Sequence, residues 1–499
     1  MPPNHHPISP DTTIPSPQVR ASFTLGRSTS PSAGPESTAE RPSKRFQVPR
    51  ACDRCKSLRR GCSEYRPCKR CVDAGVAEQC RGLTQFMGVV SPLTATSTGV
   101  SISNISTLAS PMIVDYCAAR FFERLHPTIP ILTQDYVTEL RASHISGQQD
   151  PEAACVIGAM CAQVLLQADE PENLHRQGII PDSNSDFAQR LLTAVMETHQ
   201  TLPRTVSPSL ELCLLTFFIY ACQARLFHHG QAFLFLREAT TLLLLFRRET
   251  ERDQTVRKLA DRLFWVLLIS ERSHAIRYRR PITLHITSET PQIDTSDPSL
   301  AGFWSLASLF RPIDTSFVSL LNRETFAIAP ARESLAYVEM AVNTALRPTM
   351  ELHDTQKANL RVTQLWLRII IWQLRLHLGY LTEESQHASL TYQYPVEVAK
   401  DLMLSTRDLP LDSIKVHGVG ITEKLYDVAS SVVDVLARIP LAASNSEEST
   451  MGSLPEDALV YLKHLIARLP GGDRVYTELL EKHMSQAIPR MAVSVSPTA

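Results

Sequence analysis

The chain has 499 residues, which gives room for about two to four domains with a sizeable buried core. Its 50 Lys and Arg residues offset 51 Asp and Glu residues, so the net charge of −1 by itself indicates neither a nucleic-acid binder nor an acidic partner. No apolar run reaches the roughly 18 to 20 residues of a membrane-spanning helix, and the N-terminus lacks the pattern of a secretory signal. We therefore expect no membrane partner and a reducing compartment, where dense cysteines indicate metal rather than disulfides.

The first part of the chain has the composition of a disordered tail. Nine of its first 42 residues are proline, and Ser and Thr are frequent throughout residues 1–43. Such a composition cannot repay the entropy of ordering. A cysteine-rich basic segment follows at residues 44–83, and then a Ser- and Thr-rich stretch, residues 84–111, that is predicted to be a linker. No apolar heptad repeat follows the segment, so no coiled coil is predicted there.

Positive charge is concentrated in and around the cysteine-rich segment. Residues 41–82 hold twelve Lys or Arg residues against four acidic residues, a net charge of +8, whereas the rest of the chain nets −9. A compact cationic surface of this kind is typical of a protein that binds the phosphate backbone of nucleic acid.

Six cysteines in this segment have the spacing of a metal site: Cys52-x2-Cys55-x6-Cys62-x5-Cys68-x2-Cys71-x8-Cys80. Zn²⁺ prefers four thiolates in a tetrahedron, and each Cys-x2-Cys pair can clamp one ion. Six ligands are more than one ion needs and fewer than two separate ions need. Two zinc ions that share two bridging thiolates would use all six, so we predict two Zn²⁺ per chain. Because apolar residues are few and mostly small here, the metal would also hold the segment folded.

Short helices are predicted at residues 53–58 and 69–75, each beginning at a metal-bound cysteine. The motifs around them are Arg50-Ala51-Cys52-Asp53-Arg54-Cys55 and Arg66-Pro67-Cys68-Lys69-Arg70-Cys71. Together with the six-cysteine spacing, these motifs closely resemble the fungal zinc binuclear cluster (Zn₂Cys₆) transcription factors. The resemblance implies a small zinc-stabilised two-helix module that binds DNA. It also implies that Cys52 and Cys68 bridge the ions, that Cys55 and Cys62 complete one site, and that Cys71 and Cys80 complete the other.

The same resemblance implies how the module would contact DNA. Its first helix would enter the major groove and read a CGG-like triplet. Arg59 is the expected guanine contact. Phosphate contacts are expected from Lys56 and Arg60, with help from Lys69 and Arg70. Arg50 and Arg54 are further expected DNA-binding residues. Where the family commonly has further basic residues, this chain has Ser57, Leu58 and Gly61.

From about residue 112 the chain has the 3.6-residue apolar periodicity of helices and little strand-like alternation. Helices are predicted at residues 112–125, 152–168, 185–199, 209–225, 231–248, 255–276, 334–345, 355–381, 421–438 and 456–468. Residues 121–132 and 258–281 are similar to the middle region of the same regulators. We therefore expect an all-α regulatory domain over residues 112–440, with roles in restraint, partner contact or effector sensing. Residues 441–499 are expected to add one or two helices in a partly disordered segment.

Other candidate sites in the helical part have simple structural explanations. The enzyme motifs GxSxG, HExxH, GxxxxGK and GxGxxG are absent, so no catalytic residue and no enzyme activity are predicted. His228 and His229 are expected at a helix end, where a capping role is favoured over a metal site. Cys117, Cys155, Cys161, Cys213 and Cys222 are expected to be inert core thiols. A seven-residue repeat of arginines indicates either side chains on a solvent face or a cationic stripe for an anionic effector or an acidic helix: Arg361, Arg368 and Arg375.

These features predict a nuclear, zinc-dependent, sequence-specific DNA-binding regulator of transcription that activates a particular pathway. Its expected partners are double-stranded DNA with CGG-like triplets and the transcription machinery or co-regulators, and homodimer formation stays open. Control of a secondary-metabolite gene cluster is the first expectation for the pathway, and use of carbohydrate or another nutrient is the second. The alternative is a zinc-stapled interaction or adaptor protein that does not read DNA.

Overall fold

The structure is a computed structural model of the 499-residue chain. It describes residues 54, 55, 58, 70, 71 and 74, and the ranges 105–145, 150–167, 174–246, 253–293, 297–324, 332–346, 351–438 and 455–487. The chain divides into two compact units, Met1–Pro92 and Leu93–Ala499. The tail predicted at residues 1–43 lies outside the described residues, as does most of the predicted linker. Residues 105–108, assigned to that linker, are instead helical, and Ile105 is buried in the core.

The second unit begins with a group of helices that pack around α6 (Pro151–Gln167). The others are α4 (Pro111–Arg120), the π-helical turn η2 (Phe121–Leu125), α5 (Gln134–Ile145), α7 (Asn184–Thr201), α8 (Leu210–Arg225), α9 (His229–Leu245) and α10 (Gln254–Tyr278). Residues 153–166 of α6 are all buried, since the helix is made of small and apolar side chains. Gly158 permits the close approach of α7, because a Cβ at this position would lie 2.9 Å from Cγ2 of Val195.

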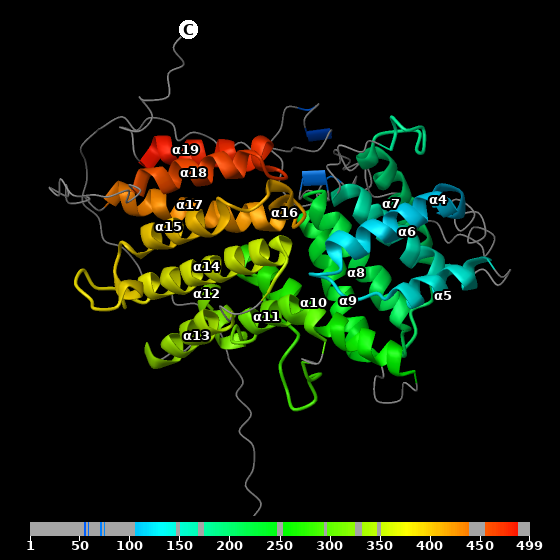
Figure 1. Ribbon diagram of the computed structural model, residues 1–499, viewed down its shortest axis with the longest axis horizontal. Coiled ribbons are helices and arrows are strands. Elements are labelled where there is room, and N and C mark those ends of the chain that lie inside the picture. The colour runs from blue at the N-terminus through cyan, green and yellow to red at the C-terminus, as the bar shows by residue number, and fades with distance from the viewer. Residues whose placement is uncertain are drawn as a thin grey trace, which may run out of the picture. The chain divides into compact units, whose positions relative to one another are not determined.

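A second group of helices packs around α14 (Asp354–His377) and α17 (Val419–Arg438). It comprises α11 (Ala301–Phe310), α12 (Thr315–Leu321), α13 (Arg332–Thr344), α15 (Tyr394–Thr406), α16 (Leu411–Lys415), α18 (Pro455–Ala467) and α19 (Thr477–Ala487), with short turns η4 (Pro298–Leu300), η5 (Ala388–Leu390) and η6 (Gly472–Tyr476). In Figure 1 the cyan to green helices of the first group and the yellow to red helices of the second lie on opposite sides of α10 and α11. The described residues form no β-strand beyond one isolated bridge between Thr382 and Thr391, so the all-α expectation for this unit is confirmed.

The C-terminal helices belong to the same core as the rest of the unit. α18 packs against α15 and α17, and α19 packs against α17. Ala458, Leu462 and Leu480 are fully buried in these contacts. The boundary drawn at residue 440 from the sequence therefore does not separate two packed bodies.

Local sequence explains where several of the helices begin and end. Ser209 caps α8, because its Oγ accepts a hydrogen bond from the backbone N–H of Leu212 at 3.0 Å. Asp253 caps α10 in the same way, through the N–H groups of Thr255 and Val256. α10 ends where Arg279 adopts a left-handed backbone with φ 54°.

A buried ionic network joins the two groups of helices, and we call it the α10–α17 network. The guanidinium of Arg277 on α10 pairs through Nε with Oε2 of Glu423 at 3.0 Å and through Nη1 with Oδ2 of Asp427 at 2.7 Å. Trp366 on α14 donates to the same Asp427 oxygen at 2.8 Å, and the hydroxyl of Tyr476 donates to Oε1 of Glu423 at 2.6 Å. Three helices far apart in sequence therefore meet at one set of charges.

Buried neutral histidines make the stability of this fold depend on pH. His199 on α7 is 3% exposed, and burial, with a smaller contribution from the Arg204 guanidinium, lowers its pKa from 6.5 to about 4. The folded state therefore keeps the ring neutral at pH values where the unfolded chain takes up a proton. Stability from this group is fully present above pH 6.5 and is lost progressively as the pH falls toward 4.

We predict that lowering the pH from 7.5 to 5.0 removes about 2 kcal/mol of unfolding free energy through His199 alone. The measurement is urea unfolding at both pH values for the native chain and for His199→Gln. The variant should lose less stability across this range by about that amount, because its side chain does not titrate. His387→Gln, on an exposed residue, serves as the control and should show the native pH dependence. An unchanged pH dependence in His199→Gln would contradict this assignment.

Candidate functional site

The described part of the cysteine-rich segment consists of two matching helical turns. Arg54 and Cys55 are helical, and the backbone N–H of Leu58 donates to the carbonyl of Arg54 at 3.0 Å. Arg70 and Cys71 are helical as well, and the N–H of Ala74 donates to the carbonyl of Arg70 at 3.3 Å. Both turns fall within the helices expected at residues 53–58 and 69–75. Each places the second cysteine of a Cys-x2-Cys pair inside a helix.

One contact between the two turns joins an arginine of the first to the cysteine of the second. Cys55 is 1% exposed and Cys71 is fully buried. Nη1 of Arg54 donates to Sγ of Cys71 at 3.8 Å, although 17 residues separate them. Cysteine binds zinc through its sulfur, as the thiolate. The donor chemistry of the two described cysteines therefore fits the metal.

The remaining residues of the predicted site lie outside the described residues. They are the ligands Cys52, Cys62, Cys68 and Cys80 and the basic residues Arg50, Lys56, Arg59, Arg60 and Lys69. Among the residues that are described, no three His, Cys, Asp or Glu side chains gather as a metal site. The two-zinc arrangement and the DNA contacts therefore remain predictions.

The arginines of α14 do not form the free cationic stripe that their spacing suggests, nor do they all lie on a solvent face. Arg375 is 4% exposed and pairs through Nη2 with Oε2 of Glu339 at 2.9 Å. Arg368 donates through Nε to the hydroxyl of Tyr394 at 2.7 Å and pairs with Asp401 at 3.3 Å. Of the three, Arg361 alone is exposed. Acidic partners from other helices, which the sequence of α14 cannot reveal, pair with Arg368 and Arg375.

The second unit, Leu93–Ala499, is called the helical unit below. Its cysteines are all buried, as expected for core thiols: Cys117, Cys155, Cys161, Cys213 and Cys222. Burial raises the pKa of Cys155 and of Cys213 to about 12, so neither forms a reactive thiolate near neutral pH.

The histidine pair lies at a helix end, as predicted. His228 is the N-cap residue of α9, but its side chain makes no capping bond, and Nδ1 lies 2.8 Å from Oε1 of Gln223. His229 points into the interior, where Nδ1 lies 3.0 Å from the hydroxyl of Tyr278.

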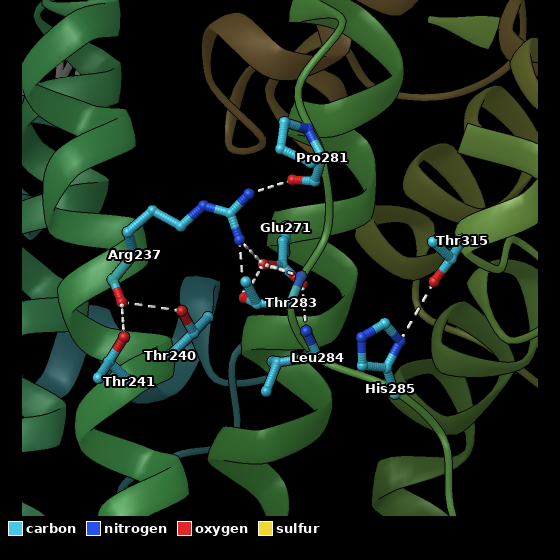
Figure 2. Close-up of polar contacts among 9 residues, drawn as sticks. All are labelled: Arg237, Thr240, Thr241, Glu271, Pro281, Thr283, Leu284, His285 and Thr315. Carbon is cyan, nitrogen blue, oxygen red and sulfur yellow. Dashed lines mark hydrogen bonds and ion pairs between the residues drawn. The ribbon is translucent and has the colours of Figure 1, made fainter. Parts of the chain in front are cut away.

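Glu271 on α10 is a structural anchor that the sequence analysis missed. Its carboxylate is 2% exposed and binds the segment that follows α10, as Figure 2 shows. Oε1 accepts from the N–H of Thr283 at 2.9 Å, Oε2 accepts from the N–H of Leu284 at 2.9 Å, and Arg237 on α9 pairs with Oε1 at 2.6 Å. Arg237 also donates to the carbonyl of Pro281. A charged residue next to the apolar run 263–269 is the only sequence signal that could have identified this anchor.

No helix among the described residues is both long and apolar enough to span a membrane. This agrees with the apolar runs counted from the sequence.

Comparison with known proteins finds relatives among fungal proteins of sugar use and transcription. No protein-family model matches the chain. A probable sucrose utilization protein of Candida albicans is 20% identical over 413 residues, which cover 79% of this chain and 79% of that protein. A maltose fermentation regulatory protein of Saccharomyces cerevisiae is 21% identical over 413 residues, which cover 77% and 85%. A respiratory transcription factor of the same yeast is 25% identical over 205 residues, which cover 40% and 42%.

These matches identify the class of protein to which the chain is related. It is a relative of fungal transcription regulators, and it is not an enzyme. The resemblance of its cysteine-rich segment to the fungal zinc binuclear cluster transcription factors is confirmed at this level.

We predict that Glu271→Gln destabilises the helical unit by about 3 kcal/mol, because it removes the charge of a buried carboxylate that pairs with Arg237 and accepts from the N–H groups of Thr283 and Leu284. Urea unfolding of the purified protein measures this loss. The matched control is Glu123→Gln, which removes an ion pair of similar length, 2.8 Å to Arg120, with Glu123 58% exposed. That change should cost less than about 1 kcal/mol. Equal losses in the two variants would show that Glu271 has no special role.

Proposed function

We propose that the protein is a zinc-dependent, sequence-specific DNA-binding regulator of transcription that acts in the nucleus. Two observations support this proposal. The first is the six-cysteine spacing, of which the two described members, Cys55 and Cys71, are buried, with the Arg54 guanidinium donating to Sγ of Cys71. The second is the long alignment with fungal regulators.

The proposed reading module spans residues 44–83 and holds two Zn²⁺. Cys52 and Cys68 bridge the ions, Cys55 and Cys62 complete one site, and Cys71 and Cys80 complete the other. When bound, zinc supplies the folding free energy that the few apolar side chains of this segment cannot supply. Two Zn²⁺ and six thiolates together carry a charge of −2, so residues 41–82 still net +6 for the phosphate backbone.

Within this module, Arg59 is the proposed base contact, on a CGG-like triplet. A bidentate arginine meets O6 and N7 of guanine in the major groove. The remaining basic residues would fix the position of the module on the phosphates and carry little sequence information. They are Lys56, Arg60, Lys69, Arg70, Arg50 and Arg54.

We assign the regulated pathway to sugar utilisation. The observation that carries this assignment is that alignments over 413 residues, including the helical unit, are with proteins of sucrose utilization and maltose fermentation. Control of a secondary-metabolite cluster, the first expectation from sequence, has no support among these relatives, and carbohydrate use takes its place. Since the two named relatives serve growth on a sugar, we propose that this chain acts as an activator.

The test is selection of bound sequences from random duplexes by the full-length native protein, Arg59→Ala and Arg60→Ala. The native protein should enrich a CGG-like site. Arg59→Ala should cost about 1 to 3 kcal/mol on that site and relax its preference, because it removes a base contact. Arg60→Ala should weaken binding to all sequences alike and lower the salt slope by about one, because it removes a phosphate contact.

Two outcomes would contradict this account. Uniform weakening in Arg59→Ala would remove its role as base reader. Failure of the native protein to enrich any sequence would favour the alternative, a zinc-stapled adaptor that does not read DNA.

A further inference from the structure

A cavity of about 220 Å³ lies in the helical unit, where the first group of helices meets α17. Its walls come from α6, α8, α9 and α10 on one side and from the turn before α17 and the first residues of α17 on the other. Drug-sized ligands occupy sites of roughly 300 to 1,000 Å³. The cavity is therefore suited to a smaller molecule. Gly420 at its edge is exposed, and Tyr220 and Tyr278 are half-buried, so solvent reaches it.

Two glutamines that line the cavity have side-chain oxygens that find no hydrogen-bond partner within the described residues. Gln163 on α6 is 1% exposed, and its Oε1 is buried without a hydrogen bond. Oε1 of Gln167, one helical turn further on, is likewise buried without a hydrogen bond. An unpaired buried carbonyl oxygen costs roughly 1 to 3 kcal/mol. Two such oxygens at one cavity indicate a site that accepts hydrogen bonds from a ligand's hydroxyl groups.

Another part of the cavity lining is a chain of hydrogen bonds. The hydroxyl of Tyr278 donates to Oε1 of Glu423 at 2.7 Å and lies 3.0 Å from Nδ1 of His229. The rings of Tyr278 and His274 lie 4.5 Å apart between centroids. This wall is held by the α10–α17 network, so its polar groups are fixed before any ligand arrives. Ser270 and Ser273 on α10 add hydroxyl groups that can both donate and accept.

The charges around the cavity are largely compensated within the protein. Arg277 is paired with Glu423 and Asp427. Burial lowers the pKa of His274 and of His417 to about 4, so both rings are neutral near pH 7. Arg225, at the end of α8, is the other cation on the lining. A lining that combines paired charges, hydroxyls and amides favours a neutral polar molecule over an ion, which would need an opposite charge of its own.

We propose that this cavity binds a neutral polyhydroxylated molecule of about monosaccharide size. Gln163 and Gln167 would accept its hydroxyl protons, and Ser270, Ser273 and Tyr278 would complete its hydrogen bonds. The choice of a sugar within this chemical class rests on the proposed function. Because the walls come from both groups of helices, a bound molecule ties α6 and α8 to the start of α17 and favours the arrangement in which they are joined.

The test is isothermal titration calorimetry of the purified full-length protein with D-glucose, D-fructose, sorbitol, sucrose and maltose. Inorganic phosphate and glucose 6-phosphate serve as charged probes. At least one of D-glucose, D-fructose and sorbitol should bind saturably, whereas the larger disaccharides and the anions should not. Gln163→Leu should weaken that binding at least about tenfold, because a leucine cannot accept a hydroxyl proton. Ser273→Ala, a smaller change on another wall, should weaken that binding several-fold. This second variant tests the proposal even if Gln163→Leu fails to fold.

The matched control is Gln364→Leu. Gln364 is 5% exposed and donates to the carbonyls of Val342 at 2.9 Å and Asn343 at 3.1 Å, away from the cavity. This variant should lose stability but keep the native dissociation constant for the probe. The proposal is overturned if no neutral probe binds, if the charged probes bind in its place, or if binding is unchanged in both cavity variants.

Selection of bound sequences from random DNA duplexes, with the same protein preparation, distinguishes failure of the cavity proposal from failure of the proposed DNA-binding function. If the protein enriches a DNA site but binds no probe, only the cavity assignment is lost. If it binds a sugar at this cavity but enriches no DNA site, the proposed function is wrong and the cavity assignment stands as a property of the helical unit.

Discussion

The joining of the two groups of helices depends on one largely buried ionic contact, that of Arg277 with Glu423 and Asp427. Each group of helices has its own apolar centre, α6 in one and α14 with α17 in the other. Apolar packing is non-directional, whereas a guanidinium held by two carboxylates fixes the register of α10 against α17. Breaking a buried pair of this kind leaves an uncompensated charge and costs several kcal/mol. The network therefore fixes how the two groups of helices pack together. It also holds in place one wall of the adjacent cavity.

A second consequence of this arrangement is that α10 is anchored along its whole length. Its apolar turns are buried, Glu271 holds the segment that follows the helix, and Arg277 holds α17. Any molecule that binds between α6 and α17 acts on a helix that contacts both groups. Effector binding, if coupled to DNA reading, therefore has a structural element on which to act, since a ligand shifts an equilibrium only through its different contacts with two arrangements.

Sequence periodicity predicted ten segments that form helices, because their apolar residues recur every three to four positions and caps such as Ser209 mark their starts. It missed α5, α11, α12, α15, α16 and α19, each of which has 13 residues or fewer. The ionic contacts could not be predicted at all, since Arg277 and Asp427 are 150 residues apart. At the cysteine-rich segment the reverse holds. Local spacing alone predicts the zinc ligands, because metal coordination fixes residue type and separation more tightly than packing does.

The most direct test of the central claim is the zinc content of the full-length protein, followed together with DNA binding during titration with a chelator. The account predicts two Zn²⁺ per chain and loss of specific DNA binding as they are removed. The helical content of residues 105–487 should persist, since none of the predicted ligands lies in that unit. One ion per chain, or specific DNA binding that survives complete removal of zinc, would contradict it.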